Sequence, residues 1–191
     1  GVKVKKIVQY GAQPQAEIIE TDYLGGFQYR NQQLLFFPHP EGYVKHTLDK
    51  NENSSYDYVY NYTDHLGNIR LSYVLDPATP VLKVLEENHY YPFGLKHTNY
   101  NSGKKGIVFE ELTESKMVKP VEENGYFYKY NGKEWQDELG LNFYDYGARN
   151  YDPAIGRWMN VDPLAENSRR WTPYNYAYNN PTYFVDTDGM Q

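Results

Sequence analysis

Apolar and polar residues alternate in several runs of the first half of this 191-residue chain. A period of two predicts β-strands that keep one face toward water. The pattern is clear at residues 2–5, 6–9 and 56–62, and further strands are expected at 17–21, 27–30, 33–37, 43–47 and 69–74. Between them stand glycine, proline, asparagine and aspartate, which are typical of turns. The pattern therefore predicts a meander of consecutive antiparallel hairpins.

Residues 56–62 and the turn after them show this pattern most clearly. Tyrosine occupies every second position of the expected strand, and Val59 faces the other way. The sequence Asp-His-Leu-Gly-Asn follows at residues 64–68. Aspartate accepts backbone hydrogen bonds in turns, and glycine and asparagine tolerate left-handed backbone angles. The segment could be read as a ligand-binding loop, but turn chemistry accounts for each of its residues, so we interpret it as a turn.

The pattern is less regular after residue 80. Residues 81–91 fit either a strand or a short helix, and their β-branched and aromatic residues favour the strand. Turn and strand motifs thin out from 96 to 124, where we expect a flexible insertion. Strands are expected again at 126–130 and, near the end of the chain, at 182–186. We therefore predict a mainly β fold in two parts, 1–125 and 126–191.

An aromatic hairpin is predicted between residues 141 and 158. Its strand runs into Asp152-Pro153, turns through Ile155-Gly156 and resumes at Arg157-Trp158. Proline presets φ near −65° and glycine supplies a positive φ, so these residues favour a chain reversal. One or two short helices are expected near 163–180. Asp162 would cap the first of them, with Pro163 at its first position.

Composition narrows the possible functions. The chain holds 22 tyrosines, which suit half-buried sheet faces because each ring is apolar and its tip polar. A net charge of −6 gives no basic stripe for a nucleic acid. There are no cysteines, and the five histidines are scattered without metal-ligand spacing, so we expect neither a metal site nor a cofactor. No apolar run approaches the length of a membrane span.

Several motifs in the second half carry a resemblance to a known family. They read Tyr144-Asp-Tyr-Gly-Ala-Arg149, Tyr151-Asp-Pro153, Gly156-Arg-Trp158, Val161-Asp-Pro-Leu-Ala165, Pro173-Tyr-Asn-Tyr176, Asn179-Asn-Pro181, Phe184-Val-Asp186 and Asp188-Gly189. In this order and spacing they resemble the associated core domain that closes Rhs/YD-repeat proteins. The residues most typical of that motif set are Tyr144, Asp145, Gly147, Tyr151, Asp152, Pro153, Gly156, Arg157, Trp158, Asp188 and Gly189. A looser match continues upstream to about residue 22.

The resemblance implies a role in a much larger protein. Residues 1–125 would be YD/Rhs-type hairpin repeats in the wall of a hollow β-shell. Residues 126–191 would plug or line one end of it and be followed by a variable C-terminal segment, often a toxin. The implied partners are the upstream repeats and that C-terminal segment. Type IX or type VI secretion machinery, or an outer-membrane translocon, would handle a secreted or cell-surface product of this kind.

An enzymatic alternative also follows from the resemblance. Rhs-type core domains that cut themselves use two Asp-Pro-x-Gly elements as an aspartic dyad, with an arginine upstream. The matching positions here are Asp162, Asp186 and Arg149, and the scissile bond would be Met190-Gln191. Two carboxylates within hydrogen-bond reach cannot both ionise, so one would act as acid while the other activates water.

This chain departs from the self-cleaving pattern in two places. Ala165 stands where the first glycine belongs and Thr187 where the second proline belongs. If the first position needs a positive φ, alanine there costs about 1 kcal/mol or prevents the turn. The alternative interpretation, which we prefer, is a buried ion-pair network in which Asp186 pairs with one of the four nearby arginines, at positions 149, 157, 169 and 170. A third possibility is a carbohydrate-binding surface formed by exposed aromatic residues.

Overall fold

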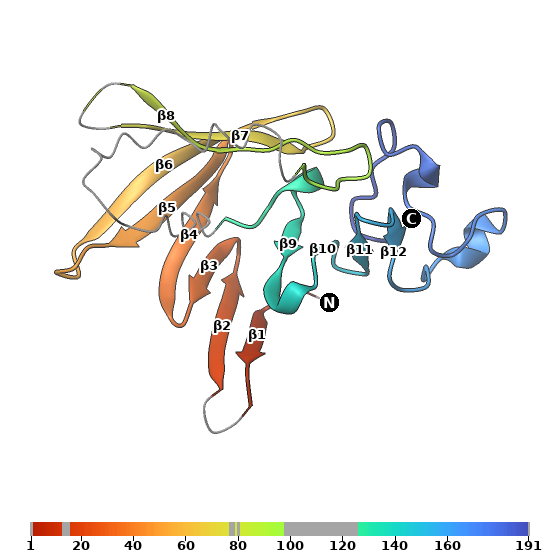
Figure 1. Ribbon diagram of the computed structural model, residues 1–191, viewed down its shortest axis with the longest axis horizontal. Coiled ribbons are helices and arrows are strands. Elements are labelled where there is room, and N and C mark those ends of the chain that lie inside the picture. The colour runs from red at the N-terminus through yellow and green to blue at the C-terminus, as the bar shows by residue number, and fades with distance from the viewer. Residues whose placement is uncertain (1, 13–15, 77–78, 80, 98–125, 191) are drawn as a thin grey trace, which may run out of the picture.

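The computed structural model describes residues 2–12, 16–76, 79, 81–97 and 126–190. Eight strands form one antiparallel sheet in which each strand pairs with the next along the chain (Figure 1). They are β1 (Lys5–Tyr10), β2 (Glu17–Leu24), β3 (Phe27–Arg30), β4 (Gln33–His39), β5 (Gly42–Leu48), β6 (Ser54–Thr63), β7 (Ile69–Leu75) and β8 (Leu82–Glu87). The predicted meander is confirmed, and residues 82–87 form the expected strand. Most of the expected insertion, 98–124, lies outside the described residues.

A smaller antiparallel sheet of four short strands lies at the other side of the molecule, in the order β12-β11-β10-β9 (Figure 1). The strands are β9 (Glu134–Gln136), β10 (Phe143–Asp145), β11 (Asn150–Asp152) and β12 (Arg157–Trp158). Four 3₁₀ helices accompany them: η1 (Tyr130–Gly132), η2 (Glu138–Gly140), η3 (Ala165–Ser168) and η4 (Ala177–Asn179). The fold is therefore mainly β, with two short helical segments between 163 and 180 as predicted.

The two faces of β6 differ as the alternation predicts. Val59 is fully buried, while Tyr58 and Tyr62 on the opposite face are 59 % and 66 % exposed. On the buried face, Val59 packs with Phe36 and Tyr43. Burial of apolar surface on this face stabilises the pairing register, because a slip by one residue would turn Val59 to water and a tyrosine inward.

Residues 126–128 pack onto the buried face of the large sheet. The ring of Tyr126 stacks on that of Tyr43, with centroids 3.9 Å apart and planes 4° apart, and Tyr128 accepts a hydrogen bond from Gln28 at 2.8 Å. The expected strand at 126–130 is wrong. Tyr128 makes one isolated bridge to Glu134, after which the chain enters η1. Side-chain packing has replaced strand pairing here.

The second core is aromatic. It consists of Tyr130, Tyr144, Tyr146, Tyr151, Trp158, Tyr176 and Ala177, all buried. Rings meet mostly at tilted or edge-to-face angles, such as 5.5 Å and 67° between Tyr151 and Trp158, a geometry that aromatic quadrupoles favour. Their hydroxyl groups bond to oxygen atoms of the protein: Tyr144 donates to the carbonyl of Gly94 and Tyr151 to that of Phe93.

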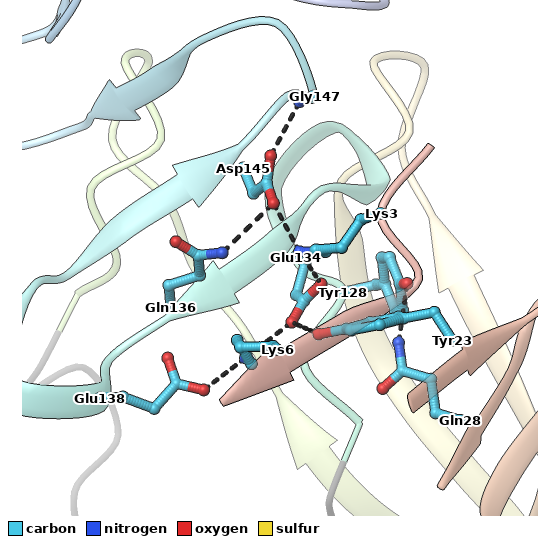
Figure 2. A network of polar contacts seen from close by, with 10 residues as sticks. All are labelled: Lys3, Lys6, Tyr23, Gln28, Tyr128, Glu134, Gln136, Glu138, Asp145 and Gly147. Atoms are coloured by element: carbon cyan, nitrogen blue, oxygen red, sulfur yellow. Dashed lines mark hydrogen bonds and ion pairs between the residues drawn. The ribbon is translucent and has the colours of Figure 1, made fainter. Parts of the chain in front are cut away.

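An ion-pair network joins the N-terminal segment to the small sheet (Figure 2). Lys3 and Lys6 lie 2.8 Å and 2.9 Å from the carboxylate of Glu134 in β9. Tyr23 of β2 donates to the same carboxylate at 2.7 Å. Lys3 also pairs with Asp145 in β10 at 2.5 Å. The two sheets are therefore tied together by contacts more than 100 residues apart in the sequence.

The protonation of this network follows from its partners. Burial by itself would raise the pKa of Glu134, but hydrogen bonds and charge from Lys3 and Lys6 outweigh it, so the pKa lies below its usual value. The pKa of Asp145 is lowered against burial in the same way, mainly by Lys3. The pKa of Lys3 is raised, although burial opposes this, because both carboxylates favour its charged form.

Two expectations for the last thirty residues are wrong in detail. The helix expected after Asp162 is shortened to η3, and Leu164 precedes it in place of Asp162. The strand expected at 182–186 is absent from the described residues. The amides of Tyr183 and Phe184 instead bond to the carbonyl of Asn180, so the backbone groups that a strand would use are committed to a turn.

Candidate functional site

Three residues singled out from the sequence meet at one buried place. Arg149 stands just before β11, Asp162 follows β12, and Asp186 lies in the last turn of the described chain. Nη1 of Arg149 lies 3.6 Å from Oδ2 of Asp162, and Nη2 lies 3.4 Å from Oδ2 of Asp186. The side chains of Arg149 and Asp186 are each 1 % exposed. We call this group the arginine cluster.

Asp186 holds the end of the described chain in a tight turn. Its Oδ1 accepts hydrogen bonds from the amides of Asp188, Gly189 and Met190 at 3.2, 2.7 and 3.3 Å. Gly189 has a φ of +78°, and a Cβ there would lie 3.0 Å from the backbone nitrogen of Arg149. Only glycine fits this position without strain or displacement.

Arg149 reaches the same turn from the other side. Its Nε donates to the carbonyl of Gly189 at 2.5 Å, and its guanidinium lies over the ring of Trp158, 4.2 Å from the centroid. Burial lowers the pKa of Arg149, and the charges of Asp162 and Asp186 oppose that effect. The side chain is therefore packed, stacked and paired at once, as a guanidinium can be and an ammonium cannot.

Further hydrogen bonds fix the backbone around the cluster. Lys133 donates to the carbonyl of Thr187 at 2.7 Å, and the amide of Ala148 donates to that of Asp188 at 3.2 Å. Together with Arg149, these groups hold three successive carbonyls of residues 187–189. The arrangement positions the chain that leads into Met190 and restrains it.

The geometry is that of an ion-pair network with an arginine at its centre. Arg149 lies between the two carboxylates and pairs with both of them. Asp186 also accepts three backbone amide hydrogen bonds. The pairing of Asp186 with an arginine, which the sequence analysis preferred, is what the structure shows.

Asp162 and Ala165 do not play the local roles expected of them. Oδ1 of Asp162 accepts from the amide of Leu164 at 2.7 Å and so closes a turn rather than capping the helix. Ala165 is absent from the residues with positive φ, so the expected conformational cost of alanine does not arise. Thr187 takes part through its carbonyl, which proline in its place would also provide.

The other arginines near the acids lie elsewhere. Arg157 donates to the carbonyl of Gly156 and to Oδ1 of Asn179 at 3.0 and 2.8 Å. Arg169 and Arg170 are exposed. Arg149 is thus the arginine that the fold brings to both carboxylates.

The remaining motif residues build the frame around the cluster. Asp145 and Asp152 each close a turn by accepting an amide hydrogen bond, from Gly147 and Ala154 at 2.8 Å. Gly156 has a φ of +63°, and a Cβ there would lie 2.9 Å from the ring of Phe93. Pro153 is buried in the same turn, and the predicted reversal between β11 and β12 is confirmed.

Asn131 was not identified from the sequence as an important residue. Its Oδ1 accepts hydrogen bonds from Tyr146 and Tyr176, both at 2.7 Å, and its Nδ2 donates to the carbonyl of Leu66 at 2.9 Å. The backbone amide of Asn131 also donates to Oδ1 of Asn68. Asn68 is the last residue of the turn between β6 and β7. An Asn-Gly dipeptide such as that at residues 131–132 is typical of a turn, but no local signal shows that the side chain of Asn131 joins the large sheet to the aromatic core.

Within the part of the chain that the structure describes, no group of three or more histidine, cysteine, aspartate or glutamate side chains could hold a metal ion. Among the same residues, no helix has the length and apolar character needed to cross a membrane.

The fold and cluster thus define a sequential antiparallel β-wall joined to a small aromatic core that restrains the end of the chain. No known protein-family profile matches the sequence. Salivary gland surface protein 1 of Aedes aegypti is 32 % identical over 118 residues, which are 58 % of this chain and 3 % of that protein. Toxin subunit YenC2 of Yersinia entomophaga is 44 % identical over 62 residues, 32 % of this chain and 6 % of the subunit. The chain therefore spans only a small part of the curated relatives it matches.

Solved structures extend the likeness over nearly the whole chain. A crystal structure of TcdB2-TccC3 without its hypervariable C-terminal region matches with a TM-score of 0.61 at 20 % identity, over 97 % of this chain and 8 % of that one. The Tc holotoxin pore of Photorhabdus luminescens, carrying the mutation TccC3-D651A, matches with a TM-score of 0.58 at 19 % identity, over 98 % and 8 %. At sequence identities this low, the structural likeness shows a shared fold and nothing more specific. With the sequence matches, this likeness supports a relationship to Rhs-related, toxin-associated proteins.

Proposed function

We propose that this chain is a section of the wall and end closure of a hollow β-shell in a much longer Rhs-related protein. The observation that supports this most is the strand order of the large sheet. All eight strands pair in chain order, so β1 and β8 lie at its two margins. Such a sheet extends by adding further hairpins at its margins, and a margin strand without its neighbour has unpaired backbone groups.

In this proposal the two parts of the chain have different tasks. Residues 1–125 form wall hairpins, and residues 126–191 form the core domain that closes one end. The arginine cluster holds residues 187–190 where the chain passes on to a variable C-terminal segment, often a toxin, which the shell encloses or presents. The upstream repeats and that segment are the partners. We further propose export by type IX or type VI machinery, or through an outer-membrane translocon, to the exterior or the cell surface.

The wall proposal is tested by comparing residues 1–191 alone with the full natural chain that contains them. The isolated segment should self-associate or unfold at low denaturant, because its margins lack neighbours, whereas the full chain should resist both. Light scattering and denaturant titration measure the two properties. A monomeric isolated segment with a cooperative transition as stable as that of the full chain would contradict the proposal.

A second candidate function is self-cleavage after Met190. The observation that favours it is that Arg149 lies beside both acids and the carbonyl of Gly189, one residue before the proposed bond. Among the described residues, one amide hydrogen bond and a 3.6 Å ion pair hold the carboxylate of Asp162, whereas three amide hydrogen bonds and an ion pair hold that of Asp186. Asp162 would therefore be the base that activates water. Gln191, on the far side of that bond, lies outside the described residues.

Intact-mass measurement on a chain that continues beyond Gln191 tests this candidate. Cleavage predicts a fragment that ends at Met190 and is lost in Asp162→Asn. Asp188→Asn is the matched control, because Asp188 is an acid of the same turn that no role in the reaction requires. An uncleaved chain, or cleavage that survives Asp162→Asn, would leave the arginine cluster with its restraining role alone.

A third candidate is a carbohydrate-binding surface on the outer face of β6. Tyr56, Tyr58 and Tyr62 are all more than half exposed on that face, and sugar rings stack on such rings through their apolar faces. A glycan array probed with the full-length protein, beside a variant with the three tyrosines changed to serine, tests it. Equal signals from the two proteins would exclude this use of the surface.

A further inference from the structure

A small cavity lies on the side of the arginine cluster formed by η3, η4 and the loop between them. Its volume is about 30 Å³, enough for one small polar group. Asp162, Asp186 and Asn175 line it together with Ser168, and Trp171 and Tyr178 also contribute to its wall. The ion pairs of the arginine cluster and the hydrogen bonds to the carbonyls of residues 187–189 do not account for this cavity.

Asn175 is the first indication that the cavity takes a ligand. The residue is 8 % exposed, and its Oδ1 has no hydrogen-bond partner among the described residues. Leaving a buried amide oxygen unpaired costs about 1–3 kcal/mol, so native structures rarely keep such a group without an occupant or a compensating role. The free oxygen calls for a hydrogen-bond donor.

The charge of the site indicates which donor. Arg149 contributes one positive charge, whereas Asp162 and Asp186 contribute two negative charges. The formal charges of these three side chains, one positive and two negative, therefore sum to −1. Arg169 and Arg170, the next arginines along the chain, are exposed and do not line the cavity. A positively charged donor complements the site, and an anion does not.

The aromatic residues narrow the choice further. The rings of Trp171 and Tyr178 lie 5.5 Å apart at 61°, and Phe184 meets Tyr178 edge-on at 5.4 Å. Trp171 and Tyr178 are about two-fifths exposed, so this wall is accessible. Aromatic faces attract organic ammonium groups by cation–π interaction. The cavity lining offers two carboxylates, and no third histidine, cysteine, aspartate or glutamate joins them among the described residues.

From these observations we infer that the cavity binds a primary ammonium group, with Asn175 and Asp162 as acceptors and Trp171 and Tyr178 against its alkyl stem. The ammonium belongs to a lysine side chain of a bound polypeptide or to a free alkylamine. This inference does not depend on self-cleavage, because the acids contribute only their charge and acceptor oxygens.

The test uses the full natural chain with 5-fluorotryptophan placed at position 171 and follows its ¹⁹F resonance. Methylammonium chloride should shift the signal saturably, while sodium chloride and methanol at equal concentration should not. A neutral peptide with one lysine, acetyl-Gly-Lys-Gly-amide, distinguishes the two sources. Binding of the peptide indicates a polypeptide ligand, and binding of methylammonium alone indicates a free amine.

Variants of Asn175 make the test specific. Asn175→Leu keeps the branched shape of the side chain and removes the acceptor, so methylammonium should bind about tenfold more weakly. Asn175→Asp adds a negative charge and should bind it more tightly, which keeps the test valid if the leucine variant folds poorly. Asn167→Leu, an exposed change in η3 outside the cavity lining, is the control. An equal response to methanol, no saturable response, or identical affinities in all variants would overturn the inference.

Discussion

The same residue, tyrosine, works differently in the two parts of this molecule. On β6 of the large sheet, tyrosines alternate with inward-facing residues and stay largely exposed. In the small core, Tyr130, Tyr144 and Tyr151 are buried, and their hydroxyl groups donate to the carbonyls of Pro92, Gly94 and Phe93. In the large sheet, a period of two is enough to place one face of each strand in the core. In the small core, each buried tyrosine hydroxyl requires a hydrogen-bond acceptor, and residues distant in the sequence provide it.

The difference has an energetic consequence. Strand pairing in the wall is spread over many similar contacts, so single changes on its exposed face are expected to be mild. The core concentrates buried charges and hydroxyls at a few residues, and removing one partner leaves another unsatisfied. Mutations of similar size should therefore cost more in residues 126–190 than in the exposed wall.

The largest effect is expected at Arg149. Arg149→Met keeps much of the apolar stem but leaves Asp186 buried without its cation, which costs about 3–5 kcal/mol. Hydrogen exchange should accelerate in residues 143–190 before it does in β2 to β7. Arg157→Met, which loses hydrogen bonds to a carbonyl and an exposed amide, is the matched control. Equal losses of stability in the two variants would contradict a special role for the arginine cluster.

A smaller loss is expected for Asn131→Ala, about 3 kcal/mol, because the hydroxyls of Tyr146 and Tyr176 lose their acceptor. Asn142→Ala is the control, since Asn142 also has a positive φ, of 55° against 50°, but bonds only locally to Gly140. Denaturant unfolding measures both. If the two variants lose the same free energy, backbone strain rather than the hydroxyl acceptor explains Asn131.

The ion-pair network between the two regions predicts a pH dependence. The folded pKa values of Glu134 and Asp145 are lowered. Their stabilising contribution is therefore present above the unfolded values near 4.5 and 3.8 and is lost as the pH falls through the folded ones. Glu134→Gln should lose about 2 kcal/mol at neutral pH, the value of a hydrogen bond to a charged group, and should show a flatter acid limb of stability against pH. An unchanged acid limb would mean that the network does not link the sheets energetically.

The smallest predicted effect compares two glycines. Gly156→Ala should cost about 1 kcal/mol more than Gly140→Ala, measured by thermal unfolding. Both glycines have a positive φ, but a Cβ at Gly156 would meet Phe93, whereas at Gly140 nothing lies within 4 Å. The shared backbone strain cancels in the comparison. Equal costs would show that Phe93 moves aside freely and that the aromatic core is looser than its geometry indicates.

Short-range chemistry explains which features could be predicted from the sequence. β1 and β6 followed from alternation, and the other strands of the large sheet followed from apolar, β-branched and aromatic runs between turn residues, because a hairpin's register depends on its own residues and its turn. The turn at 64–68 followed from aspartate, glycine and asparagine alone. Failures gathered in residues 126–190, where the chain at 126–130 and 182–186 has strand-like composition but its backbone groups bond to turns and distant segments.

What the sequence by itself determined is the order of hairpins in the large sheet and, through the family resemblance, Asp162, Asp186 and Arg149 as candidate residues. Only the tertiary structure decided that these three side chains meet, and that Asn131 joins the large sheet to the aromatic core. Alternation and turn residues act over a few positions and are visible in any short window of sequence. The placement of a buried charge or amide depends on which distant segments exclude water around it, and no short window contains that information.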